Sequence, residues 1–326
     1  MKKTYRPKIT FFLALLLSVL TLFAMYGCKS PQKKPETTPS PRQNAKANLS
    51  SEPQIKVFMH ETKEIKNMKM EEYIAGVVAG EMQNDWPVAA LAAQAIIART
   101  FTVEAVESKG GVPARNADAS TDVKEFQAYS AANINDNVKK AVEMTRGMIM
   151  TANGAPVKTW FHSSAGGMTA AAKEGLNYRE AEPPYIQSVK SPDDSAPADI
   201  QNWAAVFEAR DVLAALARQG VKADTLKSLA IGEKGPSGRA VTLVVNGRDK
   251  ISGPDFRVAL DSVKLKSMLL DKIEVSGQKV TFTGRGFGHG VGLSQWGARK
   301  LAQQGKKPEA IIAHYFKDVT VEKRWQ

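Results

Sequence analysis

The sequence predicts an α+β fold, because helical and strand-like stretches follow one another in mixed order rather than in regular βαβ alternation. Hydrophobic residues make up 43% of the chain and charged residues 24%, which is typical of a globular protein. A length of 326 residues is enough to bury a substantial core. We expect a single large mixed module with a central Ala-rich helix and a glycine-rich strand or loop that lines a groove, behind an N-terminal signal and tether.

The first 27 residues have the layout of a secretory signal. Four basic residues precede an uncharged run from Ile9 to Gly27, and Cys28 follows immediately. The stretch Ala24–Cys28 resembles a bacterial lipobox, in which the cysteine becomes the lipidated first residue, although Tyr26 is bulkier than that pattern prefers. The 19-residue run is also long enough to span a bilayer, so an uncleaved anchor is the alternative. Both interpretations predict an extracytoplasmic, membrane-anchored protein, and the first makes Cys28 the lipidation site.

Residues 28–53 are rich in Pro, Ser, Thr, Asn and Lys and predict a flexible basic tether without a core. Much of the net charge of +12 lies in the N-terminal part: residues 1–50 hold nine basic residues and one acid, which leaves 36 basic against 32 acidic residues. A nucleic-acid-binding module usually concentrates its basic charge on the fold itself. We therefore expect no nucleic-acid partner, and we expect the folded module over residues 54–326.

The first elements of this module are predicted from periodicity and capping. Alternating apolar residues predict a strand at Ile55–Phe58, and apolar residues on one side predict a helix over Met70–Met82. Asp85 is expected to cap a second helix, which has Pro87 in its first turn and runs to about Glu107. Its many alanines permit close packing, so this is the expected central helix.

The remaining elements are shorter. Residues 110–135 and 173–200 are expected to be mostly loop. Helices are predicted at Val138–Thr145, 203–219, Ser294–Gln304 and Pro308–Phe316, and strands at Met148–Met150, Val157–Phe161, Ala240–Asn246, Ile273–Phe282 and near Val319. The first two of these strands are expected to pair around the turn Asn153-Gly154, and Gly305 is expected to end the helix that begins at Ser294. Residues 201–275 form a candidate subdomain.

The motifs of several common active sites are absent from the sequence. It contains no HExxH, no paired CxxC, no GxSxG and no GxxxxGK[ST], which argues against zinc proteases, α/β-hydrolases and P-loop proteins. One cysteine and four histidines also exclude an intramolecular disulfide and a multi-cysteine zinc site. Three distinctive segments are left as candidates.

The first candidate is Glu81, which ends an otherwise apolar helical stretch just before a break and Trp86. A carboxyl group in partly apolar surroundings has a raised pKa and can act as a general acid near neutral pH. The alternative is a solvated glutamate at a helix end.

The second candidate is His162, which a hydrophobic strand delivers together with two hydroxyl groups to the turn Gly166-Gly167. This layout directs polar groups into a cleft, although a structural histidine is an equal alternative. Ser163 is not expected to be a nucleophile activated by His162, because adjacent residues of a strand point to opposite faces.

The third candidate is the block Gly284–Ala298, in which five glycines alternate at every second position. In an extended chain one face of this block would lack side chains, and a polymer ligand that approaches the backbone closely would explain the glycines. The spacing does not fit GxGxxG, so dinucleotide binding is not expected. A purely structural glycine bend is the other alternative.

Together these segments resemble the family of stage II sporulation protein D and the LytB amidase enhancers. The resemblance covers roughly residues 53–322. Its matching motifs are Gly80–Met82 with Trp86-Pro87, Ala92–Ala95 through Ala98–Thr100, Gln127–Tyr129, Phe161–Ser163 with Gly166-Gly167, Ser237–Arg239, and Gly284–Ala298.

The resemblance implies a lytic transglycosylase that acts on the glycan strands of peptidoglycan, preferably strands without stem peptides, in sporulation and engulfment or in cell-wall remodelling. Glu81 matches the catalytic glutamate of the family. It would protonate the bond between N-acetylmuramic acid and N-acetylglucosamine and then accept the proton of the C6 hydroxyl as a 1,6-anhydro ring closes. The other motif positions expected to line the glycan groove are Arg99, Gln127, Tyr129, His162, Ser163, His289, Ser294 and Gln295.

The sequence departs from the family pattern at one motif, and the resemblance leaves one alternative function. Some members of the family bind zinc through cysteines and a histidine near the Gln-x-Tyr motif, but residues 120–126 contain neither, so we expect no metal and no cofactor. The alternative function is a non-catalytic protein that binds peptidoglycan and enhances an N-acetylmuramoyl-L-alanine amidase, which would then be its partner in the cell wall.

Overall fold

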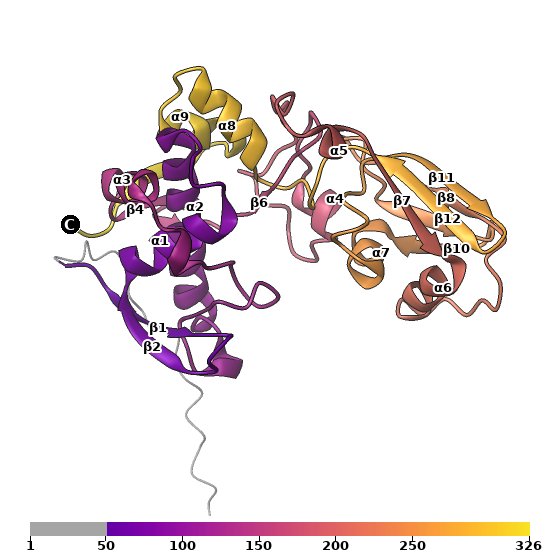
Figure 1. Cartoon of the computed structure of the whole chain (residues 1–326), viewed down its shortest axis with the longest axis horizontal. Helices are drawn as coiled ribbons and strands as arrows, with labels where there is room; N and C mark the ends of the chain where they lie inside the picture. The colour runs from indigo at the N-terminus through magenta and orange to yellow at the C-terminus, as the bar shows by residue number, and fades with distance from the viewer. Residues whose placement is uncertain (1–50) are drawn as a thin grey trace, which may run out of the picture. The chain divides into compact units, whose positions relative to one another are not determined.

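The computed structural model describes residues 51–326, which build two hydrophobic cores from mixed helices and strands (Figure 1). The predicted α+β class is confirmed. Residues 55–200 and 291–325 contribute to the first core, and residues 203–282 form the second. The predictions for the signal or anchor, for Cys28 and for most of the tether lie outside the described residues.

The first core is built from helices and three small sheets. Its helices are α1 Met70–Glu81, α2 Val88–Lys109, α3 Asp136–Met144, α8 Gln295–Gln303 and α9 Pro308–Tyr315, with the short α4 Ala172–Leu176, η1 Pro113–Arg115 and η2 Ala131–Asn133 in the connections. Its strands are β1 Gln54–Phe58, β2 Ile65–Lys69, β3 Ala119–Ser120, β4 Met148–Ala152, β5 Ala155–Pro156, β6 Phe161–His162, β13 Leu293–Ser294 and β14 Thr320–Lys323. The sheet orders are β2-β1-β3, β14-β4-β5 and β13-β6.

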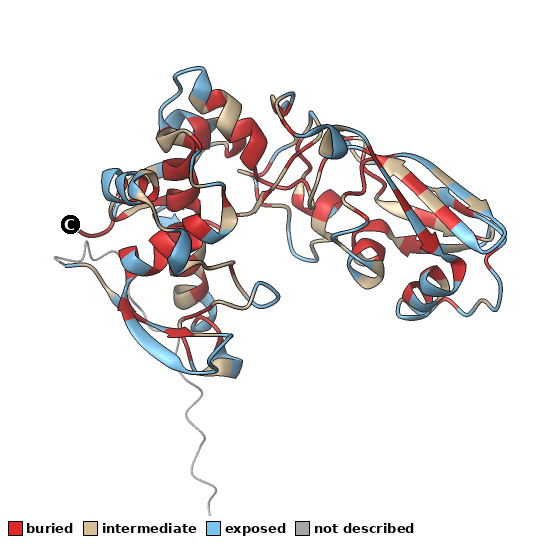
Figure 2. Ribbon diagram, in the orientation of Figure 1, coloured by how far each residue is buried: buried red, intermediate tan, exposed pale blue. Residues whose placement is uncertain are grey.

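The predicted central helix is α2, which is buried along most of its length (Figure 2). It is long and apolar enough to cross a membrane, but burial in the core accounts for that composition. The expected cap is wrong: Pro87 occupies the N-cap position, and the exposed Asp85 makes no capping hydrogen bond. Gly110 ends the helix in the left-handed conformation, with φ of 73°.

The folded part begins inside the predicted tether. The Glu52 carboxylate accepts a 2.8 Å hydrogen bond from the Glu71 main-chain N–H in the first turn of α1 and pairs with Arg146. The carbonyl oxygen of Pro53 accepts a bond from the Met70 N–H at 3.0 Å. Residues 52 and 53 therefore satisfy backbone donors at the start of α1 that no side-chain cap of Lys69 supplies.

The second core lies between two three-stranded antiparallel sheets and two helices. Its strands are β7 Trp203–Glu208, β8 Leu229–Ile231, β9 Thr242–Val245, β10 Asp249–Ser252, β11 Leu270–Ser276 and β12 Lys279–Gly284, and its helices are α6 Ala209–Ala217 and α7 Gly253–Leu260, with α5 Ala198–Gln201 at its entry. The sheet orders are β10-β9-β8 and β11-β12-β7.

Two predictions in this region are wrong. Residues 203–208 form β7 rather than the start of a helix, because alternate residues are buried and the strand pairs with β12 along its whole length. The single strand predicted at Ile273–Phe282 is a hairpin of β11 and β12, which turns at Gly277 with φ of 57°.

The predicted turn at Asn153-Gly154 is confirmed, with both residues at positive φ, but it joins β4 to the two-residue β5. Phe161–His162, which was expected to extend that second strand, forms β6 instead. This strand pairs in parallel with β13, so that His162 lies beside Ser294. The pairing brings two of the three candidate segments together.

The glycine block is not an extended strand. Four of its glycines have φ between 72° and 109°, a region that favours glycine: Gly286, Gly288, Gly290 and Gly292. A Cβ atom at Gly292 would lie 2.1 Å from the carbonyl oxygen of Trp160, and one at Gly288 would lie 2.7 Å from Cβ of His162. Other parts of the same chain therefore lie against these glycines. The block forms a glycine bend, which was the alternative interpretation of its sequence.

Candidate functional site

Glu81 is the last residue of α1 and is partly exposed. Its Oε1 accepts a 2.7 Å hydrogen bond from the main-chain N–H of Ala128. Burial raises the pKa of the Glu81 carboxyl group above its ordinary value, and the hydrogen bond from Ala128 opposes this only in part. Glu81 thus combines access to solvent with a raised pKa, which is the combination a general acid needs.

Two glycines of α1 allow residues 127–129 to reach Glu81. Gly76 and Gly80 are one turn apart on the helix, so they lie on the same face. A Cβ at Gly76 would lie 2.1 Å from the Tyr129 ring, and a Cβ at Gly80 would lie 2.7 Å from the Tyr129 nitrogen. Because neither Cβ exists, the segment lies directly on the helix, and the Ala128 N–H meets the Glu81 carboxylate. Sequence reasoning named Gly80 only as part of the motif Gly80–Met82 and missed Gly76, although their spacing of four in an apolar helix was a usable signal.

The neighbours of Ala128 hold the segment in place. Gln127 is buried and donates from Nε2 to Thr102 Oγ1 on α2 at 3.2 Å. Tyr129 is partly exposed, and its ring stacks on Tyr73 of α1 with ring centroids 6.0 Å apart. Gln127 is therefore an internal anchor, whereas Tyr129 keeps surface that a ligand can contact.

Helix α8 approaches Glu81 from another part of the chain. The Gln295 side chain donates from Nε2 to the main-chain oxygen of Glu81 at 3.1 Å. Ser294 caps α8 by accepting a bond from the Gly297 N–H, and its hydroxyl donates to Asp193 Oδ1 at 2.7 Å. Both Ser294 and Gln295 are buried, so Gln295 positions the end of α1 and Ser294 the start of α8, and neither offers surface to a ligand.

His162 and His289 lie next to each other, with ring centroids 5.6 Å apart. His162 is buried, and His289 is partly exposed. Burial lowers the pKa of His162 well below its ordinary value, and His289 and Arg239 lower it further. Burial together with Arg257 and Arg239 lowers the pKa of His289 to about 3. Both imidazoles are therefore neutral at neutral pH.

Backbone contacts indicate the tautomer of each ring. Nδ1 of His162 lies 3.1 Å from the carbonyl oxygen of Val291, so it carries the proton and donates. Its Nε2 is then an acceptor, and it is buried without a partner among residues 51–326. Nδ1 of His289 accepts a 3.0 Å bond from the Val291 N–H, which leaves its proton on Nε2. Ser163 next to them is partly exposed, and its carbonyl oxygen accepts from the Trp296 N–H.

Arg239 of the Ser-Gly-Arg motif is fully buried and ties this region together. It donates to the carbonyl oxygens of Met168 and Ala165, each at 2.8 Å, and to the hydroxyl of Ser237 at 2.9 Å. Ser237 in turn donates to the carboxylate of Glu174 at 2.6 Å. The motif is thus a structural support behind the histidine pair.

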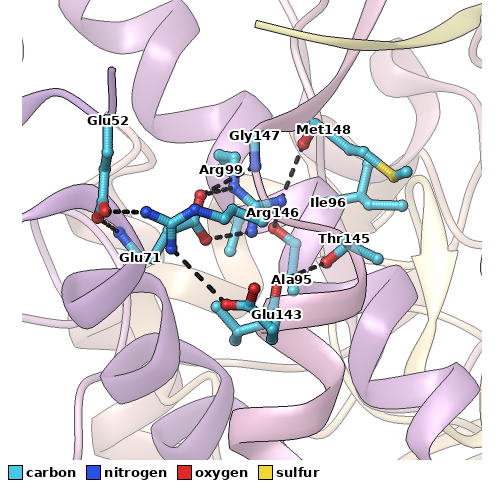
Figure 3. Close-up of polar contacts among 12 residues, drawn as sticks. Glu52, Glu71, Ala95, Ile96, Arg99, Glu143, Thr145, Arg146, Gly147 and Met148 are labelled. Carbon is cyan, nitrogen blue, oxygen red and sulfur yellow. Dashed lines mark hydrogen bonds and ion pairs between the residues drawn. The ribbon is translucent and has the colours of Figure 1, made fainter. Parts of the chain in front are cut away.

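Arg99 has no surface to offer a ligand, so its predicted place in the groove is wrong in this structure. Its guanidinium pairs with both carboxylate oxygens of Glu71 and donates from Nη1 to the Met148 carbonyl oxygen at 2.9 Å (Figure 3). The same carboxylate accepts bonds from the Gly147 N–H and from Nε1 of Trp325. Arg99 joins α1, α2 and β4 within the core. The position of Arg99 in the motif did not by itself indicate that the side chain is buried.

The structure brings most of the predicted residues into two connected groups. Glu81, Gln295 and the segment of Gln127 and Tyr129 form the first group. The second contains His162, Ser163, His289 and Ser294, and the adjacent residues Ser294 and Gln295 join the two. The members that keep surface for a ligand are Glu81, Tyr129, Ser163 and His289.

Comparisons with known proteins show which families the chain resembles. The family described as Stage II sporulation protein matches residues 59–151, and a domain of unknown function matches residues 192–292. The chain is 31% identical to the stage II sporulation protein D of Bacillus subtilis strain 168, over 98% of this chain and 96% of that protein. It is also 31% identical to the protein of that name from Bacillus amyloliquefaciens, over 90% and 86% of the two chains. The amidase enhancer of Bacillus subtilis strain 168 is 26% identical over 76% of this chain and 40% of its own length.

Proposed function

Because the chain belongs to the stage II sporulation protein D family, we propose that it is a lytic transglycosylase of the cell wall. Its substrate would be the glycan strands of peptidoglycan, preferably strands without stem peptides, and its work would lie in sporulation and engulfment or in wall remodelling. The single observation that carries the proposal is the environment of Glu81: a partly exposed carboxyl group with a raised pKa at a junction of three separate segments.

The geometry suits one carboxyl group that acts twice. The Ala128 N–H occupies Oε1, and Oε2 accepts no hydrogen bond within residues 51–326, so Oε2 can carry the catalytic proton. Glu81 donates this proton to the glycosidic oxygen as the bond between N-acetylmuramic acid and N-acetylglucosamine breaks. The resulting carboxylate removes the proton of the C6 hydroxyl as that oxygen attacks the anomeric carbon. The 1,6-anhydro ring closes, and Glu81 regains its proton.

The Ala128 hydrogen bond stabilises the carboxylate between these two steps, because a main-chain N–H favours the charged form. A second catalytic carboxylate is not required, since the nucleophile belongs to the substrate; this differs from the two-carboxylate scheme of most glycosidases. The neutral His162 offers Nε2 as an acceptor and His289 offers an N–H, so the pair can bind sugar hydroxyl or acetamido groups without adding charge.

The test is Glu81→Gln, which keeps the shape and removes the titratable proton. Mass spectrometry of peptide-free glycan strands should show 1,6-anhydro products with the native protein and none with the variant, while pelleting with the glycan is retained. The control is Glu72→Gln, which removes an exposed carboxylate from the same helix and should leave product formation intact. Anhydro products from Glu81→Gln at the native rate would refute the proposal.

A second candidate function follows from the similarity to the amidase enhancer. The protein would then bind peptidoglycan without cleaving it and would stimulate a cell-wall amidase. An assay with such an amidase distinguishes the two functions. The enhancer function is supported if the native protein releases no anhydro products and Glu81→Gln still stimulates the amidase.

We further propose that the protein acts outside the cytoplasm, held to the membrane by a lipid on Cys28 or by residues 9–27 as an uncleaved anchor. A fatty-acid probe should label the native protein and not Cys28→Ala. Labelling of the variant, or an unchanged size and membrane retention, would favour the anchor.

A further inference from the structure

A pocket of about 430 Å³ lies beside the loop that follows Glu81. Its walls come from this loop, from the first turn of α3 and from one side of α8. The residues that matter here are Gln83, Asp85, Trp86, Asn137, Arg299 and Gln303. None of the predicted site residues lines this pocket, and the mechanism above does not use it.

Arg299 stands out in this pocket because its charge is not neutralised by a neighbour. Its guanidinium carbon lies 5.1 Å from the ring centroid of Trp296 and 5.5 Å from that of Trp86. The two indoles are themselves packed with centroids 4.7 Å apart. Within residues 51–326 the Arg299 side chain forms no hydrogen bond and no ion pair, and its Nε is buried without a partner. The next residue, Lys300, pairs with Asp194 at 3.0 Å.

The aromatic pair explains how an unpaired arginine is held in place. A guanidinium over aromatic faces is attracted by the rings and loses little entropy when it binds a ligand. Its planar set of N–H groups matches the two oxygens of a carboxylate. Asp85 on the same pocket is exposed and forms no ion pair in the described part of the chain, so it can accept hydrogen bonds from hydroxyl or amide groups. The pocket therefore offers one site for a carboxylate and one for the polar groups of a sugar.

The pocket adjoins Glu81 through the residues that follow it and through α8. Gln83 follows Glu81 by two residues and accepts a 2.9 Å hydrogen bond from Nε1 of Trp86. On α8, Gln295 holds the main-chain oxygen of Glu81, and Arg299 lies four residues later, about 6 Å along the helix at ~1.5 Å per residue. A strand bound at Glu81 thus has its neighbouring sugars within reach of Arg299.

We propose that Arg299 binds a carboxylate of the glycan strand, namely the lactyl carboxylate that N-acetylmuramic acid exposes once its stem peptide has been removed. This inference rests on the proposed function and assigns a residue to substrate selection. In an intact strand the same carbon is part of an amide bond and carries no negative charge. Arg299 therefore favours peptide-free strands because it gains a charge-assisted hydrogen bond only with them.

The test measures binding without turnover, in the Glu81→Gln background. The two ligands are peptide-free glycan strands and the same strands after conversion of their lactyl carboxylates to methylamides. Glu81→Gln should bind the free acid at least about tenfold more tightly than the amide, as expected for a charge-assisted hydrogen bond. Adding Arg299→Gln should abolish this preference, and adding Arg299→Lys should reduce it, because lysine keeps the charge without the planar fork.

Lys300→Gln is the matched control, since it removes one positive charge from the adjacent position of α8 and should keep the preference. Thermal unfolding of each variant shows whether it is folded, and Arg299→Lys keeps the test decisive if Arg299→Gln unfolds. An unchanged preference for the free acid in folded Arg299 variants would overturn the inference, and so would the loss of the preference in Lys300→Gln.

Product analysis with the native protein separates this inference from the proposed function. If the native protein releases anhydro products while Arg299→Gln has native KM and native preference, the inference fails and the function stands. If the native protein releases no anhydro product but the preference still depends on Arg299, the function fails and the binding site stands.

Discussion

The main-chain N–H of Ala128 donates a 2.7 Å hydrogen bond to the Glu81 carboxylate across 47 residues of sequence. This contact depends on Gly76 and Gly80, over which the Tyr129 segment lies without side chains in between. It fixes one carboxylate oxygen and leaves the other for a proton. The conformation of residues 127–129 therefore controls the environment of the Glu81 carboxyl group.

The raised pKa of Glu81 predicts how stability depends on pH. The fold favours the protonated form, so the stability linked to this group is present below pH 4.5, its unfolded pKa, and is lost as the pH rises through the folded pKa. Glu81→Gln stays neutral at every pH. The free energy of unfolding of Glu81→Gln relative to the native protein should therefore rise between pH 4.5 and pH 8, measured by urea denaturation.

Activity should fall over the same range, because the reaction starts from the protonated acid. If the free energies of unfolding of the native protein and Glu81→Gln differ by a constant amount from pH 4.5 to pH 8, burial does not raise the pKa of Glu81.

Gly80→Ala should reduce both the stability and the activity of the protein. The new Cβ would lie 2.7 Å from the Tyr129 nitrogen and 2.9 Å from the Ala128 carbonyl carbon, so the backbone must move away from Glu81. We expect a loss of about 1–3 kcal/mol in the free energy of unfolding and a drop of at least tenfold in kcat, because the Ala128 hydrogen bond is lost.

Gly220→Ala is a suitable control for this substitution. Gly220 has φ of 84° and open space around its Cβ position, so alanine there costs stability through strain alone. Its specific activity should remain native. Equal kcat values for the folded Gly80→Ala and Gly220→Ala proteins would show that the segment at Ala128 does not support catalysis.

Breaking the pair of Arg99 and Glu71 should destabilise the fold without changing the chemistry. Arg99→Met leaves the buried Glu71 carboxylate without its cation, which typically costs about 3–5 kcal/mol. The double variant Arg99→Met with Glu71→Gln should recover part of this loss, because no buried charge is left unpaired. Denaturant unfolding of the single and double variants measures the coupling, and specific activity of the folded protein tests for a catalytic role. A stable Arg99→Met protein with strongly reduced kcat would show that Arg99 takes part in catalysis.

A fragment of residues 51–326 should be more stable than one of residues 54–326. Glu52 and Pro53 accept hydrogen bonds from the first N–H groups of α1, and Glu52 also pairs with Arg146. Their removal should lower the free energy of unfolding by about 1–3 kcal/mol. Glu52→Ala in the longer fragment should reproduce a large part of the loss. Identical denaturation midpoints for the two fragments would show that residues 51–53 belong to the tether.

The sequence by itself determined the local elements and the position of Glu81 at the end of a helix. Apolar periodicity and composition located α1 with Glu81 at its end and the buried α2. The helix predicted at Ser294–Gln304 corresponds to α8, and the Asn153-Gly154 turn was equally clear. These features depend on residues that are close in sequence, so local propensity and pattern are sufficient to predict them.

Only the tertiary structure decided what each predicted residue contacts. The motif position of Arg99 did not reveal that its side chain is enclosed by Glu71 and Met148, and the spacing of the glycines fitted both an extended strand and a series of bends. Residues 203–208 became a strand because β12 pairs with them from more than 70 residues away. The Ala128 N–H contacts the Glu81 carboxylate for the same physical reason. In each case the packing partner is distant in sequence, and the free energy of packing against it outweighs the local secondary-structure propensity.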